Sequence, residues 1–180
     1  MNNNGSSTTP NGRHTFVVHV EDKPGVLNRV ASLFRRRAFN IDSLTVGHSE
    51  LPGVSRMTIV MEADDVTARR VTANLYKLVN VVRVDDVTEA PSVMRDLALI
   101  KVQADSTVRA EILQLCDVFR ARAVDVTPGS LIVEITGTED KIEGLLDVLQ
   151  PFGILEMART GRIAMVRGRN HEMVEMTPAN

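Results

Sequence analysis

Segments with the periodicity of a strand and segments with that of a helix alternate in a fixed order along the first half of the chain. Phe16, Val18 and Val20 alternate as in a β-strand, and from Val26 the apolar spacing becomes helical. A Pro-Gly turn after Leu51 then separates two further strand-like segments. The expected strands cover 16–20, 41–47, 55–61 and 79–87, and the expected helices cover 26–38 and 66–78.

The same order recurs in the second half. The expected strands there cover 97–102, 124–126, 131–135, 154–159 and 163–166, and the expected helices cover 108–121 and 139–149. Local sequence repeats too, since Phe34-Arg-Arg-Arg-Ala-Phe-Asn-Ile-Asp is similar to Phe119-Arg-Ala-Arg-Ala-Val-Asp-Val-Thr. The order strand, helix, strand, strand, helix, strand is typical of the ferredoxin-like unit. We therefore predict an α+β protein with two tandem ferredoxin-like (βαββαβ) domains.

The junction between the domains is predicted at Ala90-Pro91-Ser92, where Pro and Ser interrupt the apolar pattern. The first domain is expected over 13–90 and the second over 91–168. Residues 1–12 are rich in Asn, Ser, Thr and Gly, and 169–180 have no period, so we expect a disordered leader and a flexible tail.

Bulk properties exclude several classes of partner. The formal net charge of -2 gives no general attraction to nucleic acid or to an anionic membrane. No apolar run approaches the ~18 residues of a membrane span. The single cysteine, Cys116, excludes an internal disulfide, and a free thiol favours a reducing compartment. We expect a cytoplasmic protein.

The turn between the first strand and the first helix has the chemistry of a small-molecule site. Pro24 and Gly25 mark a tight turn, and a glycine lets the backbone approach a ligand closely. The N–H groups that follow lie at a helix N-terminus, whose partial positive charge suits a carboxylate. A free amino acid carries such a carboxylate.

Catalytic motifs are absent from the sequence. It contains no G-x-G-x-x-G stretch, no Walker-type loop and no Cys/His cluster at metal spacing. Its four histidines form no i, i+4 pair, and Cys116 lies in an apolar stripe, where structural burial is favoured over chemistry. Aromatic residues make up only 3% of the chain, which disfavours RNA binding on the sheets.

Several longer stretches identify a family. Residues 14–168 resemble the regulatory, or small, subunit of acetohydroxyacid synthase, also called acetolactate synthase. The stretches that carry the resemblance are Val20-Glu-Asp-Lys-Pro-Gly-Val-Leu-Asn-Arg-Val, Phe39-Asn-Ile-Asp-Ser-Leu-Thr-Val-Gly, Ser55-Arg-Met-Thr-Ile-Val, Lys77-Leu-Val-Asn-Val-Val-Arg-Val, Leu97-Ala-Leu-Ile-Lys-Val and Phe119-Arg-Ala-Arg-Ala-Val-Asp-Val-Thr-Pro. The Pro-Gly turn and Asn-Ile-Asp alone indicate only an ACT domain, an amino-acid-sensing module, and the second-half stretches narrow the family.

The resemblance implies a subunit without catalytic activity of its own. It would bind the catalytic (large) subunit, raise its activity and transmit feedback inhibition by valine in branched-chain amino-acid biosynthesis. Thiamine diphosphate, FAD and magnesium would belong to that partner, which condenses pyruvate with pyruvate or 2-oxobutanoate, and no cofactor is expected on this chain. ACT domains of the family pair side by side, so a homodimer is expected, with each effector contacting both chains.

The family's effector residues fall on the first turn and on the start of the second strand. Here they are Asp22, Gly25, Val26, Leu27, Asn40 and Ile41. Backbone N–H groups of Gly25, Val26 and Leu27 can hold the effector carboxylate, while Asp22 and the Asn40 carbonyl can accept from its ammonium. Val26, Leu27 and Ile41 would bound the aliphatic side chain.

Simpler interpretations of these residues stay open. Gly25 can be only a turn residue, Val26 and Leu27 the start of a core stripe, and Asn40 a cap at the helix end. The second domain is assigned to subunit contact. An alternative function is a free-standing ACT-type sensor that regulates another enzyme or transcription.

Overall fold

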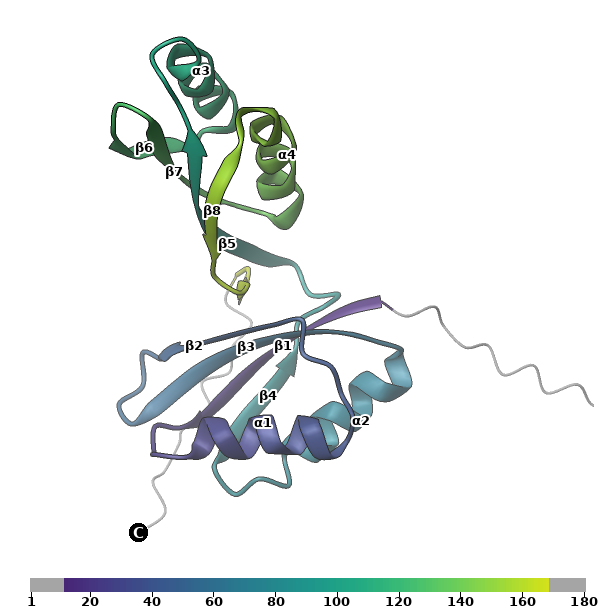
Figure 1. The fold of residues 1–180 in the computed structure, drawn as a ribbon. Helices are drawn as coiled ribbons and strands as arrows, with labels where there is room; N and C mark the ends of the chain where they lie inside the picture. The colour runs from purple at the N-terminus through teal and green to yellow at the C-terminus, as the bar shows by residue number, and fades with distance from the viewer. Residues whose placement is uncertain (1–11, 169–180) are drawn as a thin grey trace, which may run out of the picture.

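The computed structural model describes residues 12–168, and within them the elements form two units, one above the other in Figure 1. The first unit contains β1 (Gly12–Glu21), α1 (Val26–Arg36), β2 (Ser43–His48), β3 (Val54–Ala63), α2 (Asp65–Leu75) and β4 (Val81–Asp86). The second contains β5 (Ser92–Gln103), α3 (Arg109–Phe119), β6 (Arg122–Val126), β7 (Ser130–Gly137), α4 (Glu139–Leu149), the short 3-10 helix η1 (Gln150–Phe152), β8 (Ile154–Arg159) and β9 (Ile163–Val166).

The first unit is an antiparallel sheet in the order β2-β3-β1-β4, with α1 and α2 on one face (Figure 1). Its core follows from the two-residue period of β1. Phe16, Val18 and Val20 point to the helices and join their main apolar cluster, while Val17 belongs to a separate cluster on the other face. Both faces of this central strand are therefore buried.

The second unit repeats the plan with the order β6-β7-β5-β8, and α3 and α4 pack on one face of its sheet. Ile100, Leu131 and Ile142 lie in its fully buried core, contributed by two strands and a helix. The predicted α+β fold of two tandem ferredoxin-like units is confirmed.

Several element boundaries differ from the expected ones. Helix α1 ends at Arg36 rather than Ala38, because Ala38 adopts a left-handed conformation with φ 54. The next strand begins at Ser43 rather than residue 41, so Asn40 and Ile41 precede it. Leu78 to Val81 form a turn closed by the Val81 N–H and the Leu78 carbonyl, which shortens both α2 and β4.

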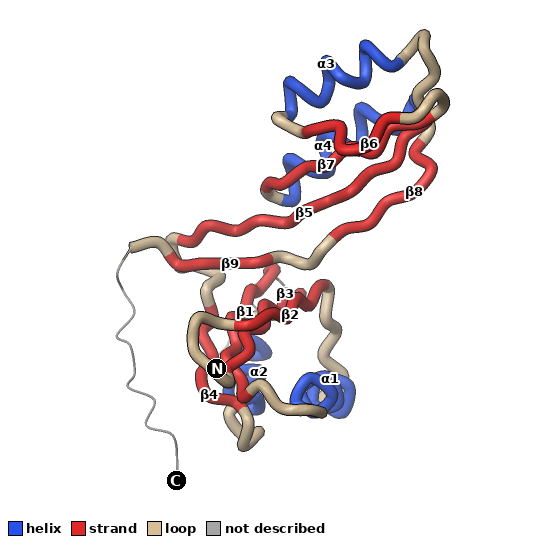
Figure 2. Tube along the Cα trace, turned by 90° about the vertical axis from the view of Figure 1, so that its left-hand side faces the viewer, coloured by secondary structure: helices blue, strands red, loops and turns tan. Residues whose placement is uncertain are grey.

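The two units meet through β5 and β9. Strand β5 begins at Ser92, earlier than expected, and its first four residues pair with β9 before the strand enters the second sheet. Figure 2 shows this two-stranded ribbon above the first sheet. Ala164 packs there with Val17 and Val87, and the Arg56 Nη2 donates to the Ala164 carbonyl at 2.6 Å. The ribbon thus covers the helix-free face of the first sheet.

The predicted leader and tail lie outside the described residues, except that Gly12 is the first residue of β1. Among the helices of residues 12–168, none is long and apolar enough to cross a membrane.

Candidate functional site

The turn before α1 presents the helix N-terminus to solvent. Gly25 is the N-cap residue, with φ 82 and ψ -5, a left-handed conformation that favours glycine. Within the described residues, no side chain caps this helix and its first turn contains no acidic residue. No acidic side chain within the first turn therefore offsets the partial positive charge of the helix end.

One of the three amides assigned to the effector carboxylate already has an acceptor. The Val26 N–H donates to the Lys23 carbonyl at 3.3 Å. The Val26 side chain is 4% exposed and belongs to the core, whereas Leu27 is 43% exposed. The Val26 side chain is thus part of the core stripe, which is the simpler interpretation of that residue. The amides of Gly25 and Leu27 remain the better candidates for binding an effector carboxylate, with the Leu27 side chain beside them.

Hydrogen bonds between Glu21, Arg29 and Asn80 connect this turn to the loop before β4. Asn80 is buried, and its side-chain oxygen accepts from the Arg29 Nη1 at 2.6 Å. Its side-chain nitrogen donates to the Glu21 carboxylate. The backbone N–H of Glu21 donates to the backbone carbonyl of Asn80 at 2.9 Å. The hydrogen bond from Asn80, followed by that from Lys23, lowers the pKa of Glu21 below its ordinary value. Sequence reasoning missed Asn80 and Arg29, because Asn80 lies 59 residues from Glu21.

Asp22 is anchored by its backbone and exposed at its side chain. Its N–H donates to the Gly53 carbonyl at 2.8 Å, and its carboxylate lies 3.4 Å from the His48 Nδ1. The side chain is 47% exposed, so it remains accessible to a ligand ammonium. We call Asp22, Gly25, Val26 and Leu27 the turn half-site.

Asn40 and Ile41 lie between α1 and β2, and we call them the strand half-site. The Asn40 Nδ2 donates to the Asp42 Oδ1 at 3.2 Å. A carboxylate only accepts hydrogen bonds, so this contact directs the amide nitrogen toward Asp42 and leaves the Asn40 carbonyl oxygen to accept from a ligand. Ile41 is half-buried against the core of the first unit.

One chain does not bring the two half-sites together. They lie at opposite ends of α1 (Figure 1), whose 11 residues span about 16 Å at 1.5 Å per residue. A free amino acid is too short to bridge that distance. Within a single chain, the six predicted residues therefore form two separate groups.

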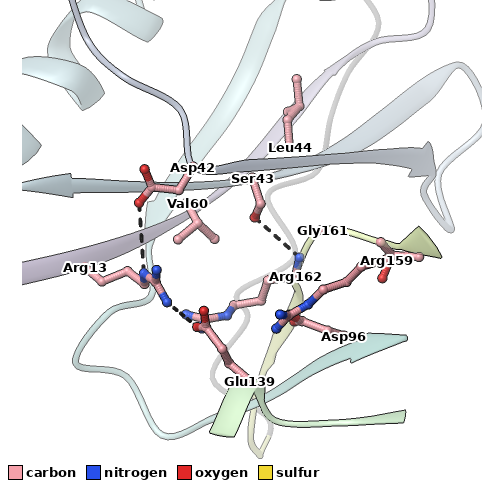
Figure 3. Close-up of a pocket in the computed structure, with 11 residues that line it drawn as sticks. Arg13, Asp42, Ser43, Leu44, Val60, Asp96, Glu139, Arg159, Gly161 and Arg162 are labelled. Atoms are coloured by element: carbon pink, nitrogen blue, oxygen red, sulfur yellow. Dashed lines mark hydrogen bonds and ion pairs between the residues drawn. The ribbon is translucent and has the colours of Figure 1, made fainter. Parts of the chain in front are cut away.

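A concave region lies between the units. A cavity of about 400 Å³ is lined by charged side chains from both units, among them Arg13, Asp42, Glu139 and Arg162 (Figure 3). Burial raises the pKa of Glu139, but the hydrogen bond from Arg13 and the charges of the neighbouring arginines outweigh it, so this pKa lies below its ordinary value. No sequence pattern predicted this cluster.

Two kinds of reactive group are relevant within residues 12–168, namely metal-ligand clusters and the single thiol. Among residues 12–168, no group of three or more His, Cys, Asp or Glu side chains gathers as metal ligands would. Cys116 is 2% exposed, and burial raises the pKa of its thiol, which disfavours the reactive thiolate.

Known proteins match both units. The family model described as an AHAS small subunit-like ACT domain matches residues 16–83, and the model for the small subunit of acetolactate synthase matches 95–168. The probable acetolactate synthase small subunit of Archaeoglobus fulgidus is 53% identical over 156 residues, which covers 87% of this chain and 98% of the relative. The acetolactate synthase small subunit of Mycobacterium bovis is 52% identical over 155 residues, which covers 86% of this chain and 92% of the relative.

A solved structure agrees with these matches. The crystal structure of the acetolactate synthase small subunit from Thermotoga maritima superimposes with a TM-score of 0.82 at 43% sequence identity, covering 88% of this chain and 99% of that chain. Together with the topology, the matches define a two-unit α+β protein whose first unit is an ACT domain. Within that class, the chain belongs to the acetolactate synthase small-subunit family.

Proposed function

We propose that this chain is the non-catalytic regulatory subunit of acetolactate synthase. It binds the catalytic subunit, raises its activity and confers feedback inhibition by valine in branched-chain amino-acid biosynthesis. The observation that carries the proposal is the uncapped, acid-free N-terminus of α1 behind Gly25, in a chain that belongs to the small-subunit family. Such a helix end supplies N–H donors and partial positive charge to the carboxylate of a free amino acid.

We propose further that the working unit is a homodimer through the ACT domains. The two half-sites at opposite ends of α1 support this, because one chain alone leaves each incomplete. In a side-by-side pair, the turn half-site of one protomer faces the strand half-site of its partner. Valine then contacts the amides of Gly25 and Leu27 from one chain and the Asn40 carbonyl from the other.

Feedback inhibition requires that valine favour a dimer arrangement that fits the active catalytic subunit less well. Typical coupling free energies between two sites are about 1 to 3 kcal/mol, a change of roughly 5- to 150-fold in affinity. Because such coupling is reciprocal for binding, the catalytic subunit should weaken valine binding by the same factor.

The remaining assignments concern partner and location. Thiamine diphosphate, FAD and magnesium act on the catalytic subunit in this proposal, and the second unit contributes to subunit contact. A cytoplasmic location agrees with the buried free thiol of Cys116.

Reconstitution tests the proposal. The catalytic subunit is assayed for acetolactate formation with and without this chain, across valine, leucine and isoleucine. We expect higher activity on addition of the chain and inhibition of that activity by valine. No change in activity would reject the assignment, and valine binding without any effect on the catalytic subunit would favour a free-standing sensor.

A further inference from the structure

The second unit contacts the first at the residues that directly follow the strand half-site. Gly161, in the connection between β8 and β9, approaches the start of β2 so closely that an added Cβ would lie 2.6 Å from the Thr45 Oγ1 and 3.2 Å from the Ser43 Cβ. The N–H of Arg162 faces the Ser43 Oγ at 3.5 Å (Figure 3). Asn40 and Ile41 are thus only a few residues from a contact between the units.

A charged network reinforces this contact. The Arg162 side chain is only 16% exposed, and it donates from Nη1 to the Thr15 Oγ1 at 3.2 Å and from Nη2 to the Glu139 Oε2 at 3.1 Å. Arg13 of β1 donates to the same carboxylate oxygen. Glu139, the first residue of α4, therefore joins two arginines at the boundary of the units.

The network continues to the strand half-site. The Arg13 Nε lies 3.9 Å from the Asp42 Oδ2, and the other oxygen of Asp42 accepts from Asn40. Figure 3 shows Asp42, Arg13 and Glu139 in succession along one side of the cavity. Glu139, Arg162, Arg13, Asp42 and Asn40 together form what we call the interdomain network.

We propose that the second unit sets the orientation of the Asn40 amide through the interdomain network, which makes Asp42 and Arg13 positioning residues of the effector site. Arg13 holds the Asp42 carboxylate. Because that carboxylate accepts from the Asn40 nitrogen, it directs the Asn40 carbonyl oxygen to the ligand. A change in the position of the second unit on the first would move Glu139 and, through Arg13 and Asp42, change the orientation of the Asn40 amide. The link to regulation rests on the proposed function, whereas the effect on Asn40 does not.

The network is partly buried at Arg162, Glu139 and Asp42, while the Arg13 side chain is 41% exposed. Glu139 and Asp42 have side chains 30% and 23% exposed, so solvent and salt screen their ion pairs less than those of fully exposed groups. Coupling along such a row of contacts is detected by changing one end and observing the other. The measurement is a perturbation at Glu139 with a readout at Asn40.

The experiment uses the full-length chain without any ligand. Nuclear magnetic resonance of the Asn40 side-chain NH₂ and of the backbone amides of 40–44 is compared between wild type and Glu139→Gln. We expect shifted resonances and faster hydrogen exchange at these positions in the variant. Arg13→Gln, which removes the middle of the network, should produce a larger change of the same kind.

Glu143→Gln is the matched control. Glu143 lies one turn further along α4 and pairs with the Arg159 Nη1 at 2.6 Å, a contact that stays inside the second unit. This control should leave the signals of 40–44 unchanged. Unchanged signals in both Glu139→Gln and Arg13→Gln would overturn the proposal, as would an equal response to Glu143→Gln.

A valine titration separates this inference from the proposed function. If wild type binds valine, Glu139→Gln should weaken the affinity by about two- to thirtyfold, the usual range for a residue coupled to a distant site. The double variant Glu139→Gln with Asp42→Asn should lose no more affinity than Asp42→Asn alone, because both act through one network. If wild type does not bind valine, the effector assignment fails, while the ligand-free resonances still decide on the network.

Discussion

At Gly25, one residue sets both the backbone conformation of the turn and the access of a ligand to the helix N-terminus. Its positive φ allows the abrupt change from strand to helix, and the missing side chain exposes the helix N-terminus. A substitution there has two separate effects. One is conformational strain, and the other is whatever the new side chain does to a bound carboxylate.

Gly25→Asp and Gly25→Asn separate these effects. Both replacements introduce a side chain of the same size in the left-handed region, which Asn and Asp tolerate best, at a similar cost of about 1 kcal/mol in folding free energy. Only Asp adds a negative charge beside the effector carboxylate. We expect Gly25→Asp to lower valine affinity at least tenfold more than Gly25→Asn in calorimetry. Equal affinities would argue against a carboxylate at this turn.

His19 gives the fold a pH dependence. Burial, followed by the positive charge of Arg56, lowers its pKa below the ordinary value of 6.5. In a mildly acidic solution the unfolded chain therefore binds a proton that the folded chain does not, so stability falls as pH decreases from 6.5 toward the folded-state value. Urea unfolding should show this loss in wild type and less of it in His19→Gln. His48→Gln, which alters a side chain 88% exposed, should keep the wild-type slope.

At the scale of elements, the short strand β9 has the least expected role. Its sequence pattern marks a strand, but its pairing with the start of β5 and its seat on the first sheet tie the two units together. Alternation decides which side chains do this. Ala164 faces the first sheet and is 4% exposed, while Met165 is 63% exposed on the opposite side.

Two neighbouring substitutions test the seat of β9. Ala164→Glu places a charge among Val17 and Val87, and burying an unpaired charge is costly, so β9 should detach at a local cost of about 2 kcal/mol or more. Hydrogen exchange should then accelerate in β9 and in residues 92–95 while β3 stays protected. Met165→Glu, one residue away, should behave like wild type. If the two variants exchange alike, the ribbon is not held through its apolar face.

Periodicity predicted the elements because apolar burial acts on neighbouring residues of one strand or helix. It gave both βαββαβ orders and the turn at Gly25. It did not give the ends of α1 and β2, which depend on the left-handed Ala38 and on local hydrogen bonds. Contacts such as Arg13 with Glu139, 126 residues apart, leave no local pattern. For the same reason, the charged cavity could not be predicted from the sequence. The six residues of the two half-sites came from the family resemblance, and their role in effector binding stays a prediction.

For the whole molecule, the separation of the half-sites makes a complementation experiment possible. Gly25→Asp disables the turn half-site and Asn40→Ala the strand half-site, so neither homodimer should bind valine. A heterodimer of the two variants retains one complete site and should bind half as much valine as wild type. In the control heterodimer, a Gly25→Asp/Asn40→Ala chain is paired with wild type, both sites are damaged, and no binding is expected. Failure of the first heterodimer to bind would reject a site shared between the two protomers.

The length of β5 has a mechanical consequence. Its 12 residues extend about 40 Å at 3.3 Å per residue, from the ribbon seated on the ACT sheet to the far side of the second core. The strand is hydrogen-bonded to β9 at its start and to β7 and β8 further along. A rigid tilt of roughly 5° at its seat would displace the opposite end by about 3.5 Å, over half a helical turn. Small movements beside β2 would thus be amplified at a surface remote from the turn at Gly25.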